Sequence, residues 1–192
     1  MNILIDGLPF CYRDTELNTD YRVWMKFELL LQDKKIKEEE KLTKIIQLTV
    51  KSEYIDINDI KGLIDYLIWF YSCGKEEEND EEEESDFKEK KKLIYSFEHD
   101  ADYIYAAFME CYKIDLVETD MHWWKFKSLL KSLNENCLYS KILGYRSMKI
   151  SSKMSKDEQK FYQEMKKTYA LPDLRTEEEK ESDFANSLFA GM

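Results

Sequence analysis

The stretch from Asp100 to Leu133 constrains the fold most, because it holds two consecutive segments of helical periodicity and a dense set of aromatic side chains. The first helix is expected to begin at Asp100 or Asp102, and Thr119 can cap the second. Their apolar stripes are Ala101, Ile104, Tyr105, Phe108, Cys111 and Tyr112, and then Trp123, Phe126, Leu129, Leu130 and Leu133. Amphipathic helices of this kind bury their stripes against other elements, so the stretch predicts a helical core.

Two aromatic side chains of this stretch fall outside the apolar stripes. Trp124 lies nearly opposite the stripe of its helix, and Tyr103 points away from the stripe of the preceding one. Because aromatic residues dominate binding hot spots, we expect Trp124, together with Trp123 and Tyr103, to contribute to a partner-binding surface. The alternative is that Trp124 contacts the N-terminal hairpin or the first helix of the same chain.

Further helices are predicted by the same periodicity at about 19–32, 38–51, 58–73, 136–144 and 155–169. The third of these ends at Gly74, a residue that readily adopts the left-handed conformation. The last begins with Ser155 and Glu158, which have the spacing of a capping box. Only five glycines and two prolines interrupt the chain, too few for the turns of a β-sandwich or barrel.

The N-terminal segment Asn2 to Tyr12 predicts a short β-hairpin. Two apolar runs flank an Asp6-Gly7 dipeptide, which suits a two-residue turn in which both central residues have positive φ. In that register Ile5 faces Leu8. The expected fold class is therefore mainly α (α+β), a helical bundle with an N-terminal hairpin.

A run of acidic residues, EEENDEEEESD at 76–86, divides the chain. So many like charges repel one another and resist burial, which favours a solvated, mobile loop; a DNA-mimicking or cation-binding surface is the alternative. We expect one helical domain over 1–172, in which this acidic linker at 75–92 separates 1–74 from 93–172. An acidic tail at 173–192 follows, either disordered or forming a docking helix.

Charge and hydropathy limit the classes of partner. A net charge of −11 repels phosphates, so we expect no nucleic acid partner unless a basic patch is hidden in the fold. The longest apolar stretch, Leu63 to Cys73, contains Asp65 and is too short to cross a bilayer, and no signal peptide is evident at Met1. Four scattered cysteines without a CxxC pair indicate reduced thiols in a cytoplasm.

Catalytic and metal-binding patterns are absent from the sequence. His99 and His122 belong to no HExxH or similar pair, and no phosphate-binding glycine loop or GxSxG elbow occurs. Cys111 lies on an apolar stripe and suits a core position. We therefore expect a protein that is not an enzyme and that has no cofactor or metal.

Several motifs carry a resemblance to a known family. The segments DADYIYAAFMECYKIDL and MHWWKFKSLLKSL within 100–133, KILGYR at 141–146 and TDYRVWMKFE at 19–28 resemble the bacteriophage gp-fifteen family of siphophage and prophage proteins. The resemblance implies a tail assembly chaperone that binds the tape-measure protein and the major tail protein in the host cytoplasm and is absent from the mature virion. It implies no catalytic residues.

Three questions stay open at this point. The chain could instead be a minor structural protein that remains in the virion, or an acidic DNA mimic that inhibits a host protein. Self-association is also possible. The chaperone role requires a surface that accepts apolar helices and an acidic body that stays soluble.

Overall fold

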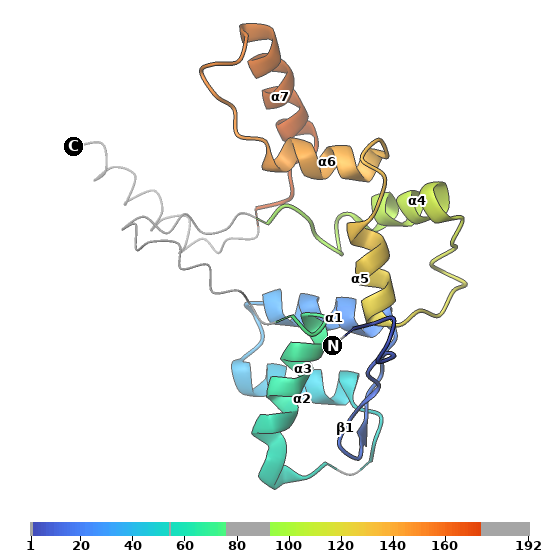
Figure 1. Cartoon of the computed structure of the whole chain (residues 1–192). Coiled ribbons are helices and arrows are strands. Elements are labelled where there is room, and N and C mark those ends of the chain that lie inside the picture. Colours follow the sequence, from blue (N-terminus) through green and yellow to red (C-terminus); the bar gives the residue numbers. More distant parts are fainter. Residues whose placement is uncertain (1, 54, 76–92, 174–192) are drawn as a thin grey trace, which may run out of the picture. The chain divides into compact units, whose positions relative to one another are not determined.

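The structure is a computed structural model that describes residues 2–53, 55–75 and 93–173. The described chain is mainly helical with a small antiparallel hairpin, as predicted (Figure 1). In chain order its elements are β1 (Cys11–Tyr12), β2 (Thr15–Glu16), α1 (Tyr21–Gln32), α2 (Glu38–Thr49), η1 (Ile57–Asp59), α3 (Ile60–Tyr71), α4 (Ala101–Tyr112), α5 (Trp123–Lys131), α6 (Leu138–Ser147) and α7 (Lys156–Thr168).

The chain divides into two compact units, Met1–Leu143 and Gly144–Met192, and each is described by itself. The acidic run at 76–86 and nearly all of the acidic tail lie outside the described residues. Their predicted mobility, and the DNA-mimic hypothesis that depends on the acidic run, therefore stay predictions. So does the expectation of one domain over 1–172.

The hairpin forms later in the chain than the Asp6-Gly7 dipeptide predicts. Its strands pair Cys11 with Glu16 and Tyr12 with Thr15. A type I′ turn at Asp6-Gly7 requires positive φ at both residues, and only Gly7 adopts it. Asp6 instead closes a local turn with Asn2, whose backbone N–H donates to the Asp6 carboxylate at 2.6 Å. The predicted turn position is therefore wrong.

Aromatic side chains from α1, α3, α4 and α5 form a large part of the core of the first unit. Phe126 stacks on Tyr21 of α1 at a centroid distance of 4.7 Å and on Phe108 of α4 at 5.1 Å. Trp123 stacks on Tyr71 of α3 at 5.7 Å. The N-terminal residues of α5 thus connect three other helices, which confirms a helical core around the stretch from Asp100 to Leu133.

Helix α3 ends at Tyr71, and the left-handed residues Cys73 and Gly74, the latter predicted, follow it. Gly74 has a φ of 69°, and its N–H donates to the carbonyl of Trp69 at 2.9 Å. In addition, a Cβ atom at Gly74 would lie 2.8 Å from the Trp124 ring. A larger residue would therefore strain both the backbone and the packing of α3 against α5.

The second unit contains the end of α6 and all of α7. The predicted capping box is present, since Ser155 accepts from the Glu158 N–H and the Glu158 carboxylate accepts from the Ser155 N–H. Tyr145 contacts Phe161 and stacks on Tyr169, each at 6.0 Å. No residue of α7 is fully buried.

The cap of helix α5 is His122, three residues later than the predicted cap at Thr119. The His122 Nδ1 accepts from the backbone N–H of Trp124 at 3.1 Å. The proton therefore resides on Nε2, which donates to the Pro9 carbonyl at 2.8 Å. Neutral His122 thus joins the start of α5 to the N-terminal segment.

This arrangement predicts a loss of stability at mildly acidic pH. Burial lowers the pKa of His122 below its ordinary value of 6.5, nearby Lys125 lowers it further, and the Pro9 hydrogen bond raises it by less. Because the unfolded chain then binds the proton more readily, His122 contributes full stability above about pH 6.5 and loses its contribution as the pH falls below that value. Urea unfolding at about pH 7.5 and about pH 5.5 measures this loss.

The matched control for this measurement is His122→Asn. Asparagine keeps a capping acceptor but does not titrate, so the variant is expected to lose part of the pH dependence. An equal pH dependence in both proteins would show that other groups cause it.

Candidate functional site

An apolar groove of about 300 Å³ opens in the first unit between α1, the N-terminal half of α4 and the loop before α5. Eight of its nine lining residues are aliphatic or aromatic, so the groove suits apolar side chains of a partner. The lining residues are Tyr21, Arg22, Met25, Phe97, Ala101, Ile104, Tyr105, Leu116 and Val117. A second hollow between α1 and α2 is less suitable, because three of its six lining residues are charged.

The floor of the groove is buried and its rim is exposed. Ile104, Phe97 and Leu116 are buried in the core, whereas Val117 is 70% exposed and Tyr105 is 37% exposed. Exposed apolar side chains beside a hollow are typical of an interaction surface. The groove is therefore present before any partner binds.

The exposure of Tyr105 differs from what the predicted stripe of α4 requires. The stripe was expected to be entirely core, and Ile104 and Phe108 are indeed buried. Tyr105 and Ala101 are exposed and line the groove instead. They lie at the edge of the stripe, on the side of α4 that faces the groove.

Arg22 fixes the outer wall of the groove to α1. Its Nη2 donates to the carbonyl oxygens of Leu116 at 3.0 Å, Val117 at 3.2 Å and Thr119 at 3.0 Å. Its Nη1 donates to the carboxylate of Asp120 at 3.0 Å. One guanidinium thus holds the whole loop, a geometry that the five fixed donors of arginine allow and lysine does not.

The protonation states of the site are fixed by burial and nearby charge. The hydrogen bond to Asp120 raises the pKa of Arg22, so the guanidinium stays charged. Burial raises the pKa of Tyr21 and also that of Tyr105, whose hydroxyl donates to Asp115 at 3.3 Å. Both phenols are therefore donors at neutral pH.

The loop beside the groove is acidic. Between Lys113 and His122 it carries Asp115, Glu118 and Asp120 against one lysine. Glu118 and Asp115 both act on Tyr105 electrostatically. A neutral or basic amphipathic segment therefore suits this surface better than an acidic one.

The three predicted partner-binding residues do not line the groove. Trp124 is 4% exposed, its indole N–H donates to the Phe70 carbonyl at 2.7 Å, and its ring contacts Trp69 edge-on at 5.3 Å. Trp123 is also buried, and Tyr103 is half-buried against the core. The expectation that Trp124 lies outside the core is wrong, because the end of α3 covers that side of α5.

The groove residues themselves were missed at the sequence level. Arg22 lies in the segment TDYRVWMKFE and Val117 in the loop after the first central helix, and nothing in either segment indicates that the two residues meet. The adjacent apolar residues Leu116 and Val117 in a charged loop are a local signal that could have marked the site.

Within 2–53, 55–75 and 93–173, no group of three or more His, Cys, Asp or Glu side chains is arranged to hold a metal ion. His122 is used as a helix cap, and the four cysteines are free thiols. None of the helices in this part of the chain combines the length and apolarity that a membrane span requires.

Comparison with known proteins identifies the family. The family model described as Bacteriophage Gp15 protein matches residues 4–171, which include all the residues of the groove. The chain belongs to the Bacteriophage Gp15 family. Neither a curated protein nor a solved structure gives a match. Membership of the Gp15 family confirms the resemblance seen in the sequence and makes the chain a bacteriophage protein.

Proposed function

We propose that this Gp15-family protein is a phage tail assembly chaperone. In the host cytoplasm it binds apolar helical stretches of the tape-measure protein, and it delivers them to the major tail protein before the tail tube closes. Its action is binding without a catalytic step. The observation that carries the proposal is the preformed apolar groove, whose acidic border favours neutral or basic helices.

The size of the groove determines how much of a partner it can hold. A volume of about 300 Å³ is at the lower end of the range for ligand pockets, so it accepts one or two large side chains. In a helix, side chains at positions i and i+4 lie on one face and can enter together. A long tape-measure helix would then need many copies of the chaperone along its length.

The experiment is co-expression with the adjacent tape-measure protein, using Val117→Asp as the test variant. Val117 is 70% exposed, so a carboxylate there leaves the fold intact but places a charge at the mouth of the groove. We expect Val117→Asp to reduce the soluble, co-purified tape-measure protein at least about tenfold, since a loss of about 1.4 kcal/mol is a tenfold change in affinity.

The matched control is Ile57→Asp, in η1 and outside the groove lining. Ile57 is 82% exposed, so the substitution adds the same charge on another well-exposed aliphatic side chain. The control is expected to keep the tape-measure protein soluble. If the two variants behave alike, the groove is not the binding surface. Mass spectrometry of purified virions tests the rival role, because a retained minor tail protein would be found there.

A further inference from the structure

The part of the second unit that the structure describes has a charge opposite to that of the chain. Residues 144–173 contain seven Lys and Arg against four Asp and Glu, a net charge of +3. Residues 174–192 carry −3, so the first unit, residues 1–143, carries the −11 of the whole chain. The net negative charge of the whole chain therefore hides a basic region at 144–173.

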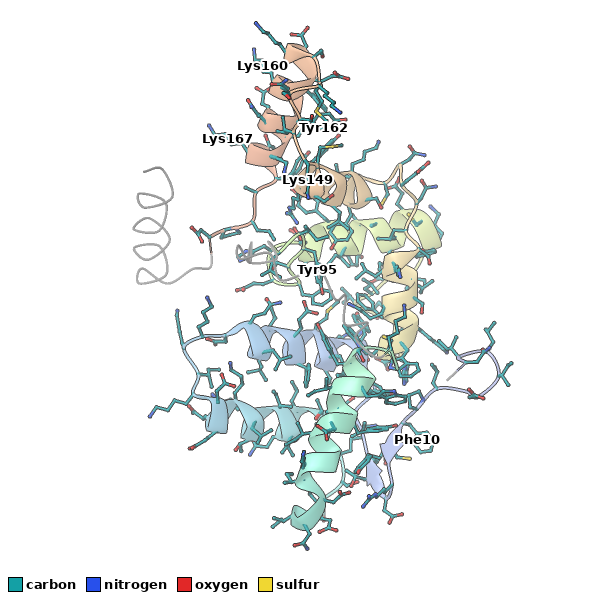
Figure 2. The ribbon with its side chains drawn as sticks, turned by 60° about the vertical axis from the view of Figure 1, so that its left-hand side comes forward. Phe10, Tyr95, Lys149, Lys160, Tyr162 and Lys167 are labelled. Atoms are coloured by element: carbon teal, nitrogen blue, oxygen red, sulfur yellow. The ribbon has the colours of Figure 1, made fainter. Side chains whose placement is uncertain are left out.

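Three lysines of α7 form a stripe along one face of the helix. Lys156, Lys160 and Lys167 are separated by four and seven residues, which at about 100° per residue places them within about 40° of one another. Figure 2 shows Lys160 and Lys167 on one side of α7 and Tyr162 on the other. All three lysines are exposed. We name this set the lysine stripe.

The packing of α7 on α6 directs the lysine stripe away from α6. Phe161 and Tyr162 contact Tyr145 of α6 at 6.0 Å and 6.5 Å. Lys166, outside the stripe, donates to the carbonyl of Arg146 at 3.1 Å. These contacts fix the rotation of α7 about its axis, so the stripe is a surface of the unit.

The charges of the lysine stripe are not neutralised within the described chain. Among the described residues, none of the three lysines forms an ion pair. Among the nearby carboxylates, Glu158 is used by the capping box, and the backbone hydrogen bond from Ser155 lowers its pKa. Asp157 and Glu164 form no ion pair with the stripe in the part of the chain that the structure describes. An acidic partner can therefore bind the stripe without displacing an internal contact.

We propose that the lysine stripe binds an acidic surface on the first unit of a second copy of this protein. Charge complementarity favours this partner, because the first unit carries −11 and the stripe is basic. The same −11 repels the phosphates of nucleic acids, and three lysines over about 17 Å of helix make a small footprint for them.

The contact joins two different surfaces, the stripe of one copy and the acidic unit of the next. Such a contact is heterologous, and unless the rotation between copies closes a ring, it produces an open chain of copies. The inference depends on the charges of α7 and is independent of the proposed chaperone role.

The test is sedimentation velocity of the full-length protein at several concentrations, at about 50 mM and about 500 mM salt. The sedimentation coefficient is expected to rise with concentration at low salt and to become independent of concentration at high salt, because salt screens exposed charges. The variant Lys156→Glu, Lys160→Glu, Lys167→Glu is expected to weaken self-association at least about tenfold.

A second triple variant, Lys35→Glu, Lys37→Glu, Lys61→Glu, is the matched control. It changes the net charge by the same amount at exposed lysines of the first unit, and it should retain most of the self-association. Circular dichroism checks that both variants are folded.

Three results would overturn the inference. The wild-type protein could stay monomeric at low salt, or both triple variants could weaken association equally. The third is that the stripe variant loses binding to a fluorescent single-stranded DNA oligonucleotide while its self-association is unchanged, which would assign the stripe to phosphate backbones.

Discussion

Replacing Trp124 by alanine is expected to lower the free energy of unfolding by about 3–5 kcal/mol. The side chain is 4% exposed and packs against Trp69 and Phe70 of α3. Alanine would leave a cavity there and would also leave the Phe70 carbonyl without its indole donor. Urea unfolding followed by circular dichroism measures the change without depending on tryptophan fluorescence.

Two comparisons separate the causes of this loss. Trp124→Phe keeps most of the ring but lacks the N–H, so it is expected to cost about 1–3 kcal/mol. Phe10→Ala removes a large aromatic ring that is 64% exposed, and its effect is expected to stay within about 0.5 kcal/mol. If Trp124→Ala is no more destabilising than Phe10→Ala, the indole does not contribute to the core.

Trp124 also shows what the sequence could and could not predict. Periodicity correctly predicts that α5 is amphipathic and that Trp123 and Phe126 lie in the core. A helical wheel assumes, however, that other elements pack against only one face of a helix. At its N-terminal end α5 is covered on two faces, by α1 and α4 on the Phe126 side and by α3 on the Trp124 side. Trp123 and Trp124 both donate to carbonyls in the last turn of α3, more than 50 residues earlier in the chain. The contact between the start of α5 and the end of α3 is therefore seen only in the folded structure.

The groove was unpredictable for the same physical reason. Its wall depends on hydrogen bonds between Arg22 and the backbone of 116–119, groups that are more than 90 residues apart. Backbone carbonyls carry no sequence signal, so the pairing cannot be read from residue types. A capping box and a left-handed glycine after a helix depend only on residues that are close in sequence. For this reason Ser155 and Gly74 were predicted correctly.

A buried carboxylate gives the second large expected effect. Glu28 on α1 is 4% exposed, and its Oε2 accepts from the hydroxyls of Tyr71 at 2.5 Å and Tyr95 at 3.1 Å. Gln32 adds a longer contact to Oε1 at 3.3 Å. Burial and the Glu28 charge raise the pKa of both tyrosines, so both hydroxyls remain donors.

Replacing both tyrosines by phenylalanine is expected to cost about 3–5 kcal/mol at neutral pH, because the carboxylate stays buried without its donors. Each single replacement is expected to cost less, about 1–3 kcal/mol. Urea unfolding of the two single variants and the double variant at neutral pH measures these losses.

Adding Glu28→Leu to the double variant tests whether the buried charge is the cause. An apolar group of similar size removes the need for the donors, and replacing a buried polar cluster as a whole is often nearly neutral. The triple variant is therefore expected to recover to within about 1–2 kcal/mol of the wild type. If it is as unstable as the double variant, the hydroxyls act through packing or other contacts, and the three residues are not coupled through the charge of Glu28.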